Sequence, residues 1–136
     1  MTTTTEQSRS VVQGIYDAAG RSDFPTLLGL IAENVHVDTP PYLPWAGPYE
    51  TRDEWLAKCV PMLGTVYDFP SLTVDHMIAE GDRVVVRVHQ KTLESEDEVV
   101  HIESWKVKDG KAIEFSVFCF DPRPVYKRLE KIGTKA

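Results

Sequence analysis

The chain has 136 residues, a size typical of a single domain with one hydrophobic core. Hydrophobic residues make up 42% of it and charged residues 26%, which excludes a disordered chain and is typical of a globular protein. Fifteen basic and twenty-one acidic side chains give a net charge of −6, which disfavours general binding to nucleic acid or to an anionic membrane. We expect one domain over residues 1–136, with a small molecule or another protein chain as its partner.

The apolar runs and the cysteines predict a cytoplasmic protein. No apolar run approaches the roughly 18–20 residues that span a bilayer. Residues 1–10 are polar and rich in threonine, without the apolar block of a secretory signal. Cys59 and Cys119 are the two thiols, a usage more typical of small core residues in a reduced protein than of a disulfide framework.

The first part of the chain predicts a helix. Thr3 and Glu6 have the spacing of a capping box at its start, and Gly20 fits a C-cap at its end. Between them, apolar residues recur at helical spacing and form one stripe, namely Val11, Val12, Ile15, Tyr16 and Ala19. We expect this stripe to pack against a sheet or against another helix.

The next segment predicts a short helix, a strand, a loop and a third helix. Pro25 opens the short helix, and a strand over 35–39 follows it. Residues 40–49 hold four prolines and three aromatic residues, a composition typical of a rigid loop. Thr51 and Glu54 have the spacing of a second capping box, and the helix after them is expected to bend or end near Pro61.

The rest of the chain predicts a sheet. Alternating and β-branched residues mark strands over about 72–80, 83–93, 98–108 and 111–121. Gly81-Asp82 and Asp109-Gly110 stand where hairpins turn, and residues 125–132 predict a short helix or a frayed end. Helices followed by consecutive strands predict an α+β fold. We expect a curved antiparallel sheet, wrapped around the N-terminal helices as a cone with an internal pocket.

Four segments carry short motifs in a characteristic order. They are Ser22-Asp23-Phe24, the segment Val35-His36-Val37-Asp38-Thr39-Pro40, residues 45–54, and residues 105–111 leading into Phe118-Cys119-Phe120-Asp121. In this order, over about residues 8–130, the chain resembles the nuclear-transport-factor-2-like superfamily. Within it, the chain is most similar to the SnoaL-like polyketide cyclases, ketosteroid isomerases and limonene epoxide hydrolases. The resemblance implies the cone fold, which hosts enzymes, binding modules and interaction domains.

Polar side chains fall on shared strand faces. Because alternate residues of a strand point the same way, four sets arise: His36 with Asp38, Arg87 with His89, His101 with Glu103 and Trp105, and Val117 with Cys119 and Asp121. These faces are either the solvated side of the sheet or converge inside the cone. Inside the cone, buried titratable groups acquire shifted pKa values and can act as acids or bases. The periodicity leaves both interpretations open.

The resemblance implies functions for several of these positions. Ketosteroid isomerases place an acidic hydrogen-bond donor on the strand before the last turn, where Glu103 stands. Limonene epoxide hydrolases have an Arg-x-Asp pair on the preceding strand, where Arg87 and His89 stand. SnoaL-like cyclases carry an acid–base aspartate near the end of the last strand, where Asp121 stands. The chain copies none of these sites in full, since Thr39 stands where the isomerases have their base.

We predict a pocket in which imidazoles lie beside carboxylates, an arrangement suited to proton transfer near pH 7. The predicted catalytic residues are Asp38, His89, His101, Glu103 and Asp121. The predicted substrate-binding residues, which would surround a flat hydrophobic molecule, are Tyr16, His36, Trp45, Trp55, Arg87, Trp105, Val117 and Cys119. The alternatives are structural: Asp121 caps a C-terminal turn, Asp38 shapes a turn, and Arg87 forms a surface ion pair.

We expect neither a metal ion nor an organic cofactor. The histidines lack HxH and HExxH spacing, and Cys59 has no His or Cys at a ligand spacing. No Gly-x-Ser-x-Gly motif and no glycine-rich loop for a phosphate or a dinucleotide is present.

The leading prediction is therefore a cofactor-independent acid–base enzyme for a polyketide-, steroid- or terpenoid-like molecule. Its reaction would be an isomerisation, cyclisation, dehydration or epoxide opening. One alternative is a non-catalytic protein that binds a hydrophobic small molecule in the same pocket. Another is an interaction module, because Phe118 and Phe120 point away from the pocket and are expected to bury against a second copy in a homodimer.

Overall fold

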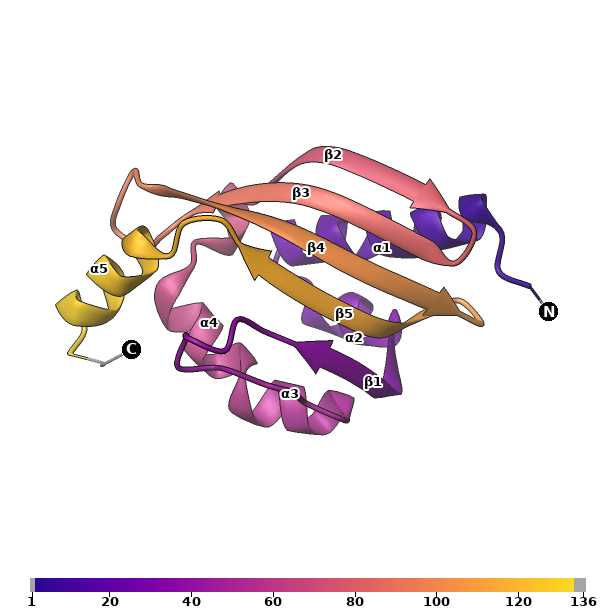
Figure 1. The fold of residues 1–136 in the computed structure, drawn as a ribbon, viewed down its shortest axis with the longest axis horizontal. Helices are drawn as coiled ribbons and strands as arrows, with labels where there is room; N and C mark the ends of the chain where they lie inside the picture. The colour runs from indigo at the N-terminus through magenta and orange to yellow at the C-terminus, as the bar shows by residue number, and fades with distance from the viewer. Residues whose placement is uncertain (1, 134–136) are drawn as a thin grey trace.

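A computed structural model describes residues 2–133 of the chain (Figure 1). The elements, in chain order, are α1 (Thr5–Gly20), α2 (Phe24–Gly29), β1 (Ile31–Asp38), α3 (Arg52–Lys58), α4 (Val60–Val66), the 3₁₀ turn η1 (Phe69–Ser71), β2 (Thr73–Glu80), β3 (Arg83–Lys91), β4 (Glu98–Lys108), β5 (Lys111–Cys119) and α5 (Arg123–Lys131). The long helix α1 lies across the sheet, and α3 lies beside β1 (Figure 1). The predicted α+β cone is confirmed.

The five strands form one sheet in the order β1-β5-β4-β3-β2. Strands β2 to β5 are antiparallel neighbours, as predicted, but β1 joins the sheet parallel to β5. The parallel pairing was not predicted. Its physical basis is the connection between these strands, which runs through three helical segments and three further strands and therefore imposes no hairpin direction.

The hairpin turns and helix caps lie at or within one residue of the positions that the sequence predicted. Gly81 and Gly110 adopt φ values of +59° and +76° in the two hairpin turns, a backbone region that glycine enters at little cost. The first capping box is formed by Thr4 and Gln7, one residue later than predicted. Thr51 caps α3 as predicted, and its side chain accepts a hydrogen bond from the backbone N–H of Glu54. Each helix of residues 2–133 is too short or too polar to cross a membrane.

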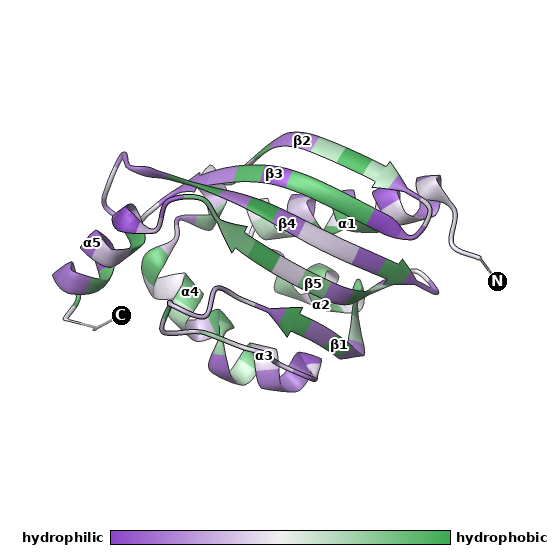
Figure 2. Ribbon diagram, in the orientation of Figure 1, coloured by the Kyte–Doolittle hydropathy of each residue, from purple (hydrophilic) through white to green (hydrophobic). Residues whose placement is uncertain are grey.

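The core lies between the sheet and α1. Val84, Val86 and Val88 of β3 are at most 1% exposed, and they face Val12 and Ile15 on the apolar stripe of α1. Hydropathy changes in bands along the strands in Figure 2, which reflects this alternation. Fully burying such a side chain stabilises the fold by about 1.5–3 kcal/mol.

One bulge sets which residues of β5 face inward. Val107 pairs with Ala112, whereas Lys106 pairs with Glu114, so Ile113 is an extra residue in β5. After the bulge, the odd-numbered positions of β5 oppose the odd-numbered positions of β4. Phe115 thus pairs with Trp105, and the two rings stack with centroids 3.9 Å apart.

Candidate functional site

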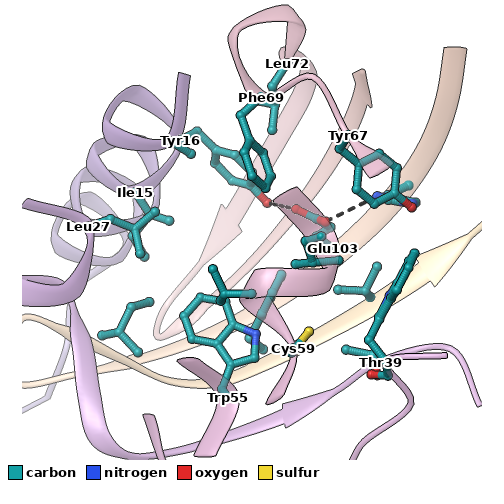
Figure 3. Close-up of a pocket in the computed structure, with 18 of the residues that line it drawn as sticks. Ile15, Tyr16, Leu27, Thr39, Trp55, Cys59, Tyr67, Phe69, Leu72 and Glu103 are labelled. Carbon is teal, nitrogen blue, oxygen red and sulfur yellow. Dashed lines mark hydrogen bonds and ion pairs between the residues drawn. The ribbon is translucent and has the colours of Figure 1, made fainter. Parts of the chain in front are cut away.

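A cavity of about 130 Å³ lies between the sheet and helices α1 to α4 (Figure 3). Its lining is mostly apolar, with Ile15 and Leu27 on one side and Trp55 and Cys59 on another (Figure 3). The polar groups of the lining come from few side chains, and they are Tyr16, Thr39, Tyr67, Gln90, His101 and Glu103. Such a cavity, apolar with a small number of convergent polar groups, is typical of a small-molecule site.

Tyr16, Glu103 and Trp105 form a buried hydrogen-bonded chain. The Tyr16 hydroxyl, from α1, donates to Glu103 Oε1 at 2.5 Å (Figure 3). It also accepts a hydrogen bond from Trp105 Nε1 at 2.9 Å. Glu103 and Trp105 are two residues apart on β4 and therefore share a face. Stacking on Phe115 holds the Trp105 ring, so the Tyr16 oxygen is fixed by a donor and an acceptor at once.

His101 lies beside the same carboxyl group. Its Nδ1 is 3.5 Å from Glu103 Oε2, and its Nε2 is 3.5 Å from the Tyr67 hydroxyl. The Tyr67 ring meets the imidazole edge-on, with centroids 5.7 Å apart. Nδ1 has no hydrogen-bond partner among the described residues, so its contact with Glu103 is an ion pair without an aligned hydrogen bond.

Burial and charge control the protonation of these groups. Burial, followed by the negative charge of Glu103, raises the pKa of Tyr16 well above its usual range. Burial by itself lowers the pKa of His101, but the side chains of Cys119 and Glu103 outweigh this effect and raise it to about 9. At neutral pH the site therefore presents a protonated imidazole and a protonated phenol beside one carboxyl group.

Seven of the thirteen predicted site residues line this cavity. They are Tyr16, Trp45, Trp55, His101, Glu103, Trp105 and Val117. Cys119 does not line it, but it is half-buried and lies directly opposite His101 in the β4–β5 register. Its contribution is therefore indirect, through the pKa of the imidazole.

His36 and Asp38 lie outside the cavity, which corrects the predicted convergence. Their side chains are 39% and 54% exposed, because Val35 and Val37 take the buried face of β1. His36 Nε2 is 3.1 Å from Asp38 Oδ2, and its Nδ1 is 3.0 Å from Glu50 Oε2. The hydrogen bond to Glu50 raises the pKa of this exposed imidazole. The solvated-face interpretation is the correct one for β1.

Arg87 and His89 also lie on the solvent side of the sheet. The buried valines of β3 occupy the other face, so these polar residues point outward. Arg87 forms an ion pair with Asp75 on β2, and His89 Nδ1 is 3.0 Å from Glu98 Oε2 on β4. Burying these groups would cost their hydration, whereas the apolar valines gain from burial.

Asp121 lies beyond the end of β5 and outside the cavity. Its Oδ1 accepts a hydrogen bond from the Arg123 backbone N–H at 3.1 Å, and its Oδ2 is 2.9 Å from Arg123 Nη2. Hydrogen bonds from Arg123 lower the pKa of this carboxyl group. Asp121 therefore caps the turn after β5, as the alternative interpretation predicted. The strand parity that grouped it with Val117 ends where β5 ends, at Cys119.

Three polar residues of the cavity were not among the predicted site residues, and they are Thr39, Tyr67 and Gln90. Gln90 follows His89 and shares the face of the β3 valines, so strand parity could have identified it. Tyr67 lies just after α4, in a segment whose position depends on an isolated bridge to Thr92, and no local pattern marks it. Among residues 2–133, no group of three His, Cys, Asp or Glu side chains is placed to hold a metal ion.

Comparison with solved structures supports the fold. A nuclear-transport-factor-2-like protein from Burkholderia thailandensis is 25% identical, with a TM-score of 0.73 over 90% of this chain and 96% of that one. Bal32a, from a soil-derived mobile gene cassette, is 21% identical, with a TM-score of 0.76 over 90% and 96%. TerC, crystallised with polyporic acid, is 22% identical, with a TM-score of 0.72 over 91% and 98%.

Comparison with protein families gives a direct assignment. No curated protein matches the chain. The model of the SnoaL-like domain matches residues 12–115, which include the second half of α1, the whole cavity lining on β3 and β4, and the first part of β5. This match spans well over half of the sequence, and the solved structures show the same fold. The chain therefore belongs to the SnoaL-like family.

Proposed function

We propose that this chain is a single-domain cytoplasmic enzyme that transfers a proton on a hydrophobic substrate without a cofactor. The observation that carries the proposal is the buried Glu103 carboxyl group, which meets the Tyr16 hydroxyl and the His101 imidazole at the wall of an apolar cavity. Titratable groups enclosed in a cavity are typical of catalytic sites, above all where their pKa values are shifted, as those of Tyr16 and His101 are. The SnoaL-like family, which includes isomerases and cyclases, supports this class of chemistry.

The arrangement suits removal of a proton from a carbon next to a carbonyl group. The C–H bond breaks, the proton passes to the Glu103 carboxylate, and the electron pair moves onto the carbonyl oxygen. The protonated His101 is placed to donate a hydrogen bond where that negative charge develops, whereas Tyr16 donates its single hydroxyl proton to Glu103 Oε1 and thereby positions that carboxyl group. Return of the proton to a different carbon completes an isomerisation. Alternatively, the enolate carbon attacks a second carbonyl of the same molecule, and the alkoxide that forms takes the proton back from Glu103, which completes a cyclisation.

The walls of the cavity define the substrate class. Trp55, Leu27 and Phe69 surround the polar groups with apolar surface (Figure 3). A polyketide-, steroid- or terpenoid-like molecule with a ring system and a carbonyl group matches this lining. TerC, which has the same fold, was co-crystallised with polyporic acid, and this supports a small organic molecule as the ligand.

Solvent-deuterium exchange tests the proposal without knowledge of the natural substrate. The protein is incubated in D₂O with a panel of apolar β,γ-unsaturated ketones and 1,3-diketones, and deuterium incorporation is followed by mass spectrometry. We expect Glu103→Gln to slow incorporation by about 10²–10⁴-fold, the usual contribution of a positioned acid or base. Asp121→Asn is the matched control, because that carboxylate lies outside the cavity, and it should exchange at the wild-type rate.

Two results would contradict this assignment. An unchanged rate in Glu103→Gln would remove Glu103 as the catalytic base. Binding of these ketones with no incorporation above the uncatalysed rate would favour the alternative function, a non-catalytic protein that binds hydrophobic molecules.

We also propose that two copies associate through the outer face of the sheet. Ile78, Val85, Ile102 and Phe118 are 39–69% exposed on this face, and the register pairs Ile78 with Val85 and Ile102 with Phe118. This clustering of exposed apolar side chains is typical of an interaction surface. Ion pairs such as Arg83–Glu114 give the same face both signs of charge, which favours a second copy of this chain as the partner.

A further inference from the structure

We propose that the cavity encloses a single six-membered ring of the substrate, and that Phe69 and Leu63 of its lining set this limit. The inference rests on the proposed function and narrows its substrate class. The ring that bears the carbonyl group is enclosed, and any further ring of the molecule stays outside.

The first observation is the size of the cavity, which is about 130 Å³. An apolar cavity of about 150 Å³ in another protein takes up one benzene molecule, whereas sites for drug-sized ligands measure about 300–1,000 Å³. The enclosed space is therefore sufficient for one six-membered ring and too small for two fused rings.

The second observation is the arrangement of polar and apolar walls. The Glu103 carboxyl group, on β4, is the acceptor for the Tyr16 hydroxyl, whereas Phe69 and Trp55 lie on opposite sides of the cavity (Figure 3). A carbonyl oxygen that faced the apolar walls would lose its hydration without gaining a hydrogen bond. The enclosed ring is therefore the one that carries the carbonyl group, with its oxygen on the polar side.

The third observation locates the opening of the cavity. Phe24, the first residue of α2, lines the cavity and is nevertheless 39% exposed, so the cavity reaches the surface beside it. A second ring of a ligand would have to pass this opening and remain in contact with water. It would then add little affinity, because the gain depends on the apolar area that leaves water.

Phe69 and Leu63 are the wall residues whose truncation tests the limit. Phe69 belongs to the 3₁₀ turn η1 and Leu63 to α4, and both are half-buried, whereas Trp55 is 8% exposed and Trp105 is 2% exposed. Their loss therefore disturbs the core less than loss of a tryptophan would. Because both side chains line the cavity, the space that either truncation frees is continuous with it.

Three ketones that share the same carbonyl-bearing ring measure the limit, namely cyclohexanone, trans-2-decalone and a saturated steroid 3-ketone. All three tryptophans of the chain line the cavity, so quenching of tryptophan fluorescence by the ketone reports binding there. For the wild type we expect saturable quenching by cyclohexanone, a gain in affinity of less than about tenfold for decalone, and no further gain for the steroid ketone. Full enclosure of the second ring would instead raise affinity by roughly 10²-fold.

Two enlarged variants and one control make the outcome decisive. Phe69→Ala should raise the ratio of decalone affinity to cyclohexanone affinity by about tenfold or more over the wild type, because the second ring then leaves water. Leu63→Ala enlarges the cavity from another element and should raise the ratio by a smaller factor. Phe120→Ala removes a ring that is 86% exposed and outside the lining, and it should keep the wild-type ratio.

Three results would overturn the proposal. They are a lack of saturable binding of cyclohexanone, a gain of about tenfold or more for decalone in the wild type, and a wild-type ratio in both enlarged variants.

The binding assay separates this inference from the proposed function. The expected order of the ketones without any deuterium exchange would contradict the enzyme and leave the size limit in place. Deuterium exchange together with a large gain for decalone in the wild type would contradict the size limit alone. Absence of both binding and exchange would contradict both.

Discussion

Strands β3 and β4 carry the same alternation of polar and apolar residues but orient it in opposite ways. In β3 the valines face inward and Arg87 faces water, whereas in β4 His101 and Glu103 face inward and Ile102 faces water. The register explains the difference, because Val86 is paired with Glu103, and paired residues of adjacent strands share a face. An alternating pattern therefore defines two faces, and the neighbouring strand decides which one is buried.

The consequence is chemical. The exposed pairs of the outer face, such as Arg87 with Asp75, are screened by water and contribute little to stability. The His101–Glu103 pair has side chains that are only 5% and 11% exposed, so each charge acts strongly on the other. The same types of residue are surface charges on one side of the sheet and a candidate acid–base site on the other.

The largest effect expected from this comparison is a pH dependence of stability that belongs to the buried histidine. Because folding raises the pKa of His101 from 6.5 to about 9, its contribution is fully present below pH 6.5 and is lost as the pH rises through about 9. The free energy of unfolding should therefore fall by about 3 kcal/mol over this range, as urea titrations at several pH values would show. His101→Gln should abolish this component, whereas His89→Gln on the outer face should retain it. An equal slope in wild type and His101→Gln would contradict the buried ion pair.

A smaller effect is expected from neighbouring valines on the two faces of β3. Val86 is fully buried and Val85 is 42% exposed. Val86→Ala should lower the free energy of unfolding by about 2 kcal/mol, through lost apolar contact and a residual cavity. Val85→Ala, measured in the same denaturant titration at a concentration where the protein is monomeric, should change it by less than about 0.5 kcal/mol. Similar losses in both variants would mean that the outer face is also buried in the monomer.

The smallest effect concerns the apolar cluster of the outer face. Phe118 is 60% exposed and lies beside Ile102. If two copies meet through this face, Phe118→Ser should weaken dimerisation by about tenfold or more, as loss of an aromatic interface residue commonly does. Light scattering over a range of micromolar concentrations measures this change. Glu33→Gln, on an exposed side chain away from the cluster, is the control. A wild-type protein that stays monomeric throughout would rule out the dimer.

Seven of the thirteen site residues predicted from the sequence line the cavity. The period of two on β4 was sufficient to group His101, Glu103 and Trp105, and the stripe on α1 was sufficient to select Tyr16. The period of two does not show whether a strand face is buried or exposed. His36 and Arg87 were therefore predicted to lie in the pocket, although both face solvent. Asp121 was misplaced for a different reason, because parity was extended past the end of β5.

The sequence by itself determined most of the elements and the hairpin turns at Gly81 and Gly110, because these depend on local periodicity and on backbone preferences of single residues. The order of the elements and the resemblance to a known family indicated the cone fold. Only the tertiary structure decided that β1 runs parallel to β5, that β4 turns its polar face toward α1, and that Tyr67 and Gln90 join the cavity. These features depend on contacts between residues far apart in the chain. A local pattern specifies which side chains share a face of a strand. Which face is buried depends on the free energy of burial, summed over all the side chains that pack against that face.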